Sequence, residues 1–132
     1  MALVWTDNLA VGVEMMDADH QTLLLMLAQM AEEPDEKFVT LFNDVAHHLE
    51  EHFGRENELM RRYDFFAYHC HRSEHDSVLA WVRSLAAKAA AGDLAESRRF
   101  ISSEIEPWFI EHRNTMDLVT ARFVAGALQT QD

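Results

Sequence analysis

The sequence places potential metal ligands one helical turn apart at two points along the chain. His52 and Glu56 are separated by four residues, and so are His71 and His75. In an α-helix this spacing brings both members of a pair to one face, about 6 Å apart along the axis. Surface helices also carry such pairs, so neither pair is specific alone. If its side chains point into a core, each pair could converge on one metal ion or on a close pair of ions.

A third potential pair, His112 and Asp117, has a spacing of five residues. On an ideal helix Asp117 lies roughly 140° round the axis from His112. The helix must therefore loosen or end between them if both side chains bind the same centre. Asn114 and Thr115, which are weak helix formers, lie between the two and favour such loosening.

These residues need a helical scaffold, and the composition favours one. The chain has only four glycines and two prolines in 132 residues, and 48% of its residues are hydrophobic. A chain of this length forms one domain with a real core. We predict an all-α protein, an antiparallel up-down four-helix bundle with an extended N-terminal arm. The single domain covers residues 1–132, with the arm at 1–17 and helices at about 18–32, 36–62, 67–91 and 94–124.

Local signals predict where these helices begin and end. Asp17 is placed to cap the first helix, and Pro34 ends it. Gly92 with Asp93 stops the third helix, and Pro107 predicts a kink within the fourth. The inward-facing series of the fourth helix is predicted to be Ile101, Ile105, Trp108, His112, Met116 and Val119.

Six polar side chains fall on helix faces that otherwise have the pattern of a core. An unpaired or ionised group costs several kcal/mol when it is buried. A bundle with hydrogen-bonded core histidines is the alternative, but it leaves too many buried polar groups. The pattern therefore favours a bound group. The six residues are His20, His52, Glu56, His71, His75 and His112.

The number of potential ligands indicates two metal ions. With Asp117 the set has seven members, which overfill one tetrahedral zinc site and one octahedral site. Two six-coordinate ions offer twelve positions. If both carboxylates bridge, the seven side chains and one bridging oxygen occupy eleven of them. One position stays open for a small exogenous ligand, and the imidazole-rich set suits iron.

Motifs spread over nearly the whole chain resemble those of the hemerythrin family, specifically its single-domain bacterial members. The resemblance implies a di-iron centre, oxo- or hydroxo-bridged, in a four-helix bundle. It assigns His71, His75 and His112 to the saturated iron, His20 and His52 to the iron with the open position, and Glu56 and Asp117 to the bridges. The matching residues are Trp5, Val11-Gly-Val13, Asp17-x-x-His20, His52-Phe53-x-x-Glu56, His71-x-x-x-His75 and Trp108-x-x-x-His112-x-x-x-x-Asp117.

Five further residues are predicted to surround the open position. Phe53, Trp108 and Phe109 belong to the core and would exclude water from it. His48, one turn before His52, is interpreted as a residue at the edge of the pocket rather than a ligand. Arg113 stands where the family usually has an aliphatic residue. Either Arg113 turns outward, or the pocket is more polar and wetter than usual.

The resemblance implies reversible binding of dioxygen at the open iron, for oxygen carriage, storage or sensing. The alternative is an enzyme that uses the same site as an oxidase, a peroxidase or a nitric oxide reductase, which a polar Arg113 would favour. A third hypothesis is a sensory module in which the state of the site repacks the N-terminal arm against a partner.

The charge of the chain limits its partners. Acidic residues outnumber basic ones by 23 to 11, and the formal net charge is −12, which repels nucleic acid and anionic membranes. No segment reaches the 18 or so apolar residues of a membrane span. Cys70 is the only cysteine, is expected to pack away from the ligands, and suits a reducing compartment. We expect a soluble cytoplasmic protein whose ligand is O2 or a small anion.

Overall fold

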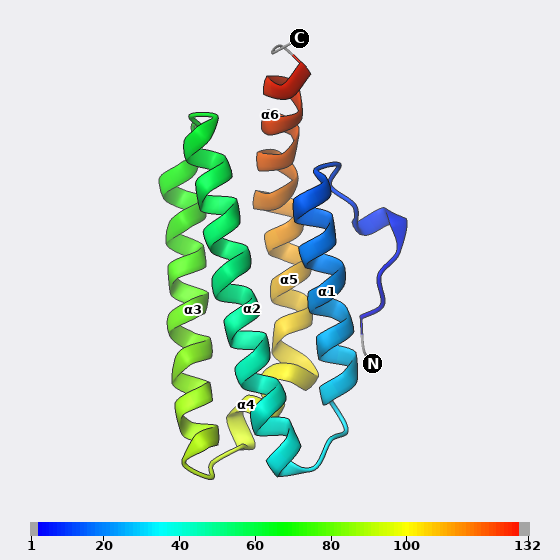
Figure 1. The fold of residues 1–132 in the computed structure, drawn as a ribbon, viewed down its shortest axis with the longest axis vertical. Helices are drawn as coiled ribbons and strands as arrows, with labels where there is room; N and C mark the ends of the chain where they lie inside the picture. The colour runs from blue at the N-terminus through cyan, green and yellow to red at the C-terminus, as the bar shows by residue number, and fades with distance from the viewer. Residues whose placement is uncertain (1–2, 130–132) are drawn as a thin grey trace.

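The structure, a computed structural model, describes residues 3–129 and confirms an antiparallel up-down four-helix bundle (Figure 1). Three helices run without interruption, and the fourth is a continuous helical run that contains two wider π-helical turns. No helix within the described residues is both long and apolar enough to cross a membrane. The bounds are α1 Glu14–Met30, α2 Asp35–Arg62, α3 Tyr68–Ala90, α4 Ala95–Arg99, η2 Phe100–Glu104, α5 Ile105–His112, η3 Arg113–Asp117 and α6 Leu118–Gln129.

The first helix begins earlier than the sequence predicted. It starts at Glu14, so the described part of the arm ends at residue 13 rather than 17, and Asp17 is not its cap. The Asp17 carboxylate instead accepts hydrogen bonds from the backbone N–H groups of Val11 at 2.7 Å and Gly12 at 3.1 Å. Gly12 has a φ of 94°, which favours glycine, and this bend directs the arm into the helix.

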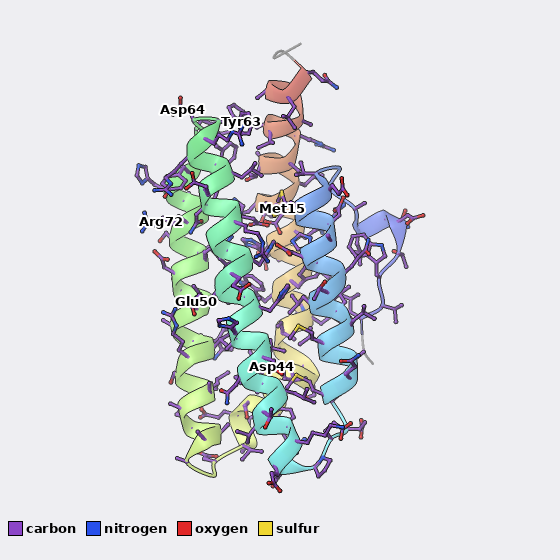
Figure 2. All side chains as sticks on the ribbon, viewed as in Figure 1. Met15, Asp44, Glu50, Tyr63, Asp64 and Arg72 are labelled. Carbon is purple, nitrogen blue, oxygen red and sulfur yellow. The ribbon has the colours of Figure 1, made fainter. Side chains whose placement is uncertain are left out.

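Both predicted interruptions between the later helices are confirmed. After α2, Asp64 adopts a left-handed φ of 52°, and the Phe65 N–H donates to the Met60 carbonyl at 2.9 Å. This hydrogen bond belongs to a Schellman motif, which ends a helix by satisfying its last carbonyl groups. Figure 2 shows Tyr63 and Asp64 at the end of the bundle where α2 turns towards α3. Gly92, with a φ of 98°, ends α3 in the same way.

The last helix does not end at Pro107, which lies in α5, and the π-helical turn η2 directly precedes α5. Proline lacks the N–H that would continue the helical hydrogen bonds, and such irregularities concentrate near proline. The second π-helical turn, η3, separates α5 from α6. The extra residue in this turn shifts the inward face of α6, so Val119 is exposed while Thr120, Ala121 and Val124 are buried. The expectation that Val119 faces inward was therefore wrong.

The apolar core is divided along the bundle. A large cluster fills the half that contains the α1–α2 connection, and includes Phe42, Phe53 and Phe109. A small cluster of Val11, Met16 and Ala121 fills part of the other half. On α1 and on the last helix the potential metal ligands lie between the two clusters in sequence, so the polar side chains form a layer across the bundle.

The N-terminal arm lies along the outside of the bundle, next to α1 (Figure 1). Arg113 holds it there, because its guanidinium donates to three successive backbone carbonyls of the arm. The acceptors are Asn8 at 3.0 Å, Leu9 at 3.1 Å and Ala10 at 2.9 Å. Charge-assisted hydrogen bonds of this kind are stronger than neutral ones. Arg113 therefore fixes the arm to the turn that carries Asp117.

Replacing Arg113 with alanine should loosen the arm while the bundle stays folded. Loss of these hydrogen bonds is expected to speed amide hydrogen exchange at Leu9, Ala10 and Val11 by about tenfold or more, which corresponds to about 1.4 kcal/mol of local stability. Arg122→Ala, at an exposed position on α6, is the control and should leave these amides unchanged. Equal exchange in the two variants would show that Arg113 does not hold the arm.

Candidate metal centre

The structure brings all seven predicted ligand side chains into one buried layer, which we call the polar layer. Each of the four helical segments contributes to it, and every member is at most 4% exposed. α1 contributes His20, α2 contributes His52 and Glu56, α3 contributes His71 and His75, and the last helix contributes His112 and Asp117.

His71, His75 and His112 lie on one side of the polar layer. We call these histidines, together with the carboxylate oxygens nearest to them, the three-histidine group. Glu56 Oε1 lies 3.1 Å from His75 Nε2 and 3.4 Å from His71 Nε2. Asp117 Oδ1 lies 3.1 Å from His71 Nε2 and 3.0 Å from His112 Nε2. The Nε2 atoms of His71 and His112 are 3.2 Å apart. Neighbouring ligands about 2.1 Å from one ion stand about 3 Å apart, so these distances fit a single ion.

The other two histidines form the two-histidine group with the remaining carboxylate oxygens. Glu56 Oε2 lies 2.8 Å from His52 Nε2 and 3.7 Å from His20 Nε2. Asp117 Oδ2 lies 3.2 Å from His20 Nε2. Each carboxylate thus presents one oxygen to the three-histidine group and the other to the two-histidine group, which is the arrangement of two bridges between neighbouring ions.

Several atoms of the polar layer lack a hydrogen-bond partner although they are buried. They include both oxygens of Glu56, both oxygens of Asp117 and Nε2 of His75. Buried polar atoms are nearly always satisfied, so a cluster of unsatisfied acceptors indicates a missing cation. The donor set of imidazole nitrogens and carboxylate oxygens suits divalent transition metals, and the residues present therefore fit a metal centre.

The π-helical turn η3 explains how Asp117 reaches the polar layer. The predicted loosening between His112 and Asp117 takes this form, with the N–H of Leu118 bonding to the carbonyl of Arg113 five residues earlier. One wider turn of five residues returns the chain to the same face of the helix. His112 and Asp117 therefore both point inward, with 3.0 Å between His112 Nε2 and Asp117 Oδ1.

Four of the five histidines are also held at their outer ring nitrogen, Nδ1, by residues that the sequence analysis did not identify. Such partners orient a ligand histidine and select its tautomer. Their positions depend on how neighbouring helices align, which no single-helix spacing reveals. The pairs are His52 with Asp19 at 2.8 Å, His71 with Thr120 at 2.8 Å, His75 with Asn57 at 2.9 Å and His112 with Glu74 at 3.0 Å.

Asp19 is itself held in place by Arg55. The guanidinium donates through Nε and through a terminal nitrogen, each at 2.9 Å, to the two carboxylate oxygens of Asp19. Burial opposes ionisation of Asp19, but the hydrogen bonds and charges of His52 and Arg55 outweigh it and lower its pKa to about 2. Asp19 is therefore an anion that fixes His52. By contrast, Nδ1 of His20 has no hydrogen-bond partner.

Aromatic rings cover the polar layer on the side that faces the larger apolar cluster. Phe53 stacks on His75 with 4.1 Å between ring centroids, and Trp108 stacks on His112 at 4.7 Å. The ring of Phe109 meets His20 edge-on at 5.1 Å. The three predicted pocket aromatics thus contact imidazoles of both groups and limit their exposure to water.

His48 and Arg113 lie at the margin of the polar layer. The His48 ring is parallel to that of His52 at 6.3 Å, and its Nε2 bonds to the backbone carbonyl of Asp19 at 3.0 Å. Arg113 turns outward to the arm, which is the first of the two arrangements considered for it.

The other two histidines, His47 and His69, lie outside the polar layer and are exposed. Cys70 also lies outside this layer, as expected, but it is exposed rather than packed.

Protons balance the buried carboxylates in the metal-free protein. Burial opposes charge on His52, but attraction to Glu56 and a hydrogen bond with Asp19 outweigh it and raise the pKa of His52 to about 10. Burial likewise opposes charge on His71, but the adjacent Asp117 and Glu56 carboxylates raise its pKa to about 9. Burial alone would raise the pKa of Glu56, whereas the charge of His52 and the other adjacent imidazoles hold it well below its usual range.

Metal loading should therefore release protons. Near pH 8 His52 and His71 are protonated in the metal-free protein, and only neutral imidazole binds a metal. We expect release of at least about two protons per chain on adding Co2+ in weak buffer, and an apparent affinity that rises with pH between about 7 and 9. A pH indicator measures the release. His47→Ala should release the same number, and metal binding without proton release would contradict the charge balance described here.

Comparison with known proteins identifies the family. The hemerythrin family, described as the hemerythrin HHE cation binding domain, matches residues 11–122. A bacteriohemerythrin of Ralstonia nicotianae is 36% identical over 121 residues, which cover 92% of this chain and 88% of that protein. A bacteriohemerythrin of Aquifex aeolicus is 32% identical, covering 85% of this chain and 89% of its own.

Solved structures agree on the fold. A crystal structure of wild-type hemerythrin has a TM-score of 0.82 to this structure at 19% sequence identity, and the match covers 94% of this chain and 98% of that chain. The family match and the bacteriohemerythrin relatives extend over most of the sequence, including every residue of the polar layer. This chain therefore belongs to the hemerythrin HHE cation binding domain family.

Proposed function

We propose that the polar layer holds two iron ions and that the protein binds dioxygen reversibly beside the two-histidine group. One observation carries this proposal. In both Glu56 and Asp117, one carboxylate oxygen faces the three-histidine group and the other faces the two-histidine group. Hemerythrins bind non-haem iron, and the curated relatives are bacteriohemerythrins and a myohemerythrin. The iron pair would supply the two electrons that dioxygen accepts on binding and returns on release.

The two groups differ in the number of donor atoms they offer. The three-histidine group has three nitrogens and two carboxylate oxygens, whereas the two-histidine group has two nitrogens and two carboxylate oxygens. With one added bridging oxygen, six-coordination is complete on the first side and one position short on the second. The exogenous ligand is therefore expected beside His20 and His52.

The surrounding side chains favour binding over further reaction. Phe109 contacts His20, and Phe53 contacts both His52 and His75, so apolar rings shield the layer from water. The alternative of an oxidase, a peroxidase or a nitric oxide reductase relied on an Arg113 that makes the pocket polar. Its guanidinium binds the arm carbonyls instead, so Arg113 does not supply the polar pocket on which this alternative relied.

Alternating gas exposure tests the proposal. Iron-loaded, reduced protein should contain about two irons per chain and develop a visible absorption band under O2 that disappears under argon over repeated cycles. Optical spectra and metal analysis on the same sample measure both. A band that only bleaches to a ferric product, or an iron content near zero, would refute reversible binding at this centre.

A matched pair of variants locates the centre in the same assay. His75→Ala removes a nitrogen of the three-histidine group and should lower the iron content and abolish the band. His47→Ala removes an exposed histidine of α2 and should change neither. Similar iron contents in the two variants would place the iron elsewhere.

Asp19 should determine how firmly the second iron is retained, because it fixes His52 through Nδ1. Asp19→Ala is expected to weaken metal binding by the two-histidine group about 10- to 100-fold, the usual effect of removing such a partner. Iron content during titration with a chelator measures this, and it should fall first towards about one per chain. The exposed acid Asp44 on α2 provides the control variant Asp44→Ala, and identical chelator curves would contradict the role of Asp19.

A further inference from the structure

An apolar cavity opens between α1 and the last helix, and we call it the α1–α5 cavity. Its volume is about 280 Å³. Leu24, Leu27 and Ala28 line it from α1, and Ile105 and Phe109 line it from α5. The polar side chains of Glu32, Ser102 and Glu106 also border it, so the cavity is largely but not wholly apolar. Leu3 of the N-terminal arm also lines it, so the arm that Arg113 fastens is part of its wall. Cavities with such walls admit small apolar molecules.

Phe109 is the side chain that joins this cavity to the metal centre. Its ring is 2% exposed and lines the α1–α5 cavity. The same ring lies edge-on to His20, at 5.1 Å between centroids and an interplanar angle of 90°. His20 belongs to the two-histidine group through Asp117 and Glu56. One aromatic ring therefore separates the cavity from the side of the centre that has the fewer donor atoms.

The other hollows near the centre adjoin its other side. A pocket of about 120 Å³ is lined by Ala67, Cys70 and His71 among others, and so adjoins the three-histidine group. A wider groove between α3 and the last helix is bordered by Glu74 and Glu111 and by several hydroxyl side chains. A gas that passed through either hollow would reach the group whose coordination is complete. Of these three cavities, the α1–α5 cavity is the one lined by Phe109, whose ring contacts the two-histidine side.

We propose that the α1–α5 cavity is a binding site for small uncharged gas molecules, and that these reach the two-histidine group by displacement of the Phe109 ring. This inference rests on the function proposed above, because it supplies the ligand of that site. Dioxygen is apolar and small, so it partitions from water into a cavity of this kind. Water gains no hydrogen bonds from the leucine, isoleucine and phenylalanine side chains of the cavity, and the carboxylates of Glu32 and Glu106 repel anions, so the route favours the gas.

Xenon tests the cavity without any iron. Under xenon pressure, metal-free or iron-loaded protein should show xenon in the α1–α5 cavity next to Phe109, by crystallography or by xenon NMR. Ala28→Trp places an indole at the exposed mouth of the cavity and should abolish this site. Ala67→Trp obstructs the pocket beside His71 and should leave it intact. Absence of xenon from the cavity of the unmodified protein would overturn the proposed gas site.

Oxygen kinetics test the passage. In iron-loaded protein, Ala28→Trp should slow both association and dissociation of O2 by about threefold or more and leave the equilibrium affinity within about twofold, because a blocked route raises the barrier in both directions. Phe109→Leu should speed both rates. Ala28→Met, a milder obstruction, should give a smaller slowing, and the iron content of each variant verifies its fold.

Each outcome decides a separate claim. Unchanged rates in an Ala28→Trp variant that has lost xenon, or slowing by Ala67→Trp instead, would overturn the passage past Phe109. A protein that takes up no O2 would refute the proposed function and with it the passage, while the xenon result would still decide whether the cavity binds gas.

Discussion

Two carboxylates buried among five imidazoles are the constraint on which the rest of this bundle depends. Glu56 and Asp117 are both fully buried, and within residues 3–129 neither forms an ion pair with a lysine or arginine. Isolated buried charges are costly, so the side chains around them must supply positive charge or hold an ion that does. Every helix contributes to that task, and the apolar core is divided into two parts as a result. The polar layer thus sets the alignment of the four helices at mid-bundle.

That layer is supported from both sides. Aromatic rings of Phe53, Trp108 and Phe109 cover it towards the larger apolar cluster, and hydrogen-bond acceptors hold the outer nitrogens of four histidines. The supports are unequal, because His52 faces a carboxylate clamped by Arg55 whereas His20 has no partner at Nδ1. A site that binds and releases a ligand without losing its geometry needs such rigid surroundings. The less constrained ring of His20 can shift when the ligand binds.

Sequence periodicity predicted the bundle and the inward position of six polar side chains, because spacing along one helix determines which residues share a face. The seventh, Asp117, was assigned by the resemblance to the family. It failed where the answer depends on another element. Asp19 and Glu74 were missed because they meet histidines of neighbouring helices. The predicted start of α1 and the predicted burial of Val119 were wrong for local reasons. The bend at Gly12 lets α1 begin at Glu14, and the extra residue of η3 turns Val119 outward; helix propensity reveals neither. The destination of Arg113 depends on the arm, 103 to 105 residues away in sequence.

The wide turn η3 also restricts how such a centre can arise. Asp117 faces inward because the helix carries one more residue than an α-helical turn would between His112 and the carboxylate. Exchanging amino acids on a regular helix cannot place a ligand pair at this spacing on one face. A deletion in this turn would rotate α6 and move its buried residues Thr120, Ala121 and Val124 out of the core. We therefore expect proteins that keep the centre to tolerate no insertion or deletion in this turn, whereas exposed loops tolerate both.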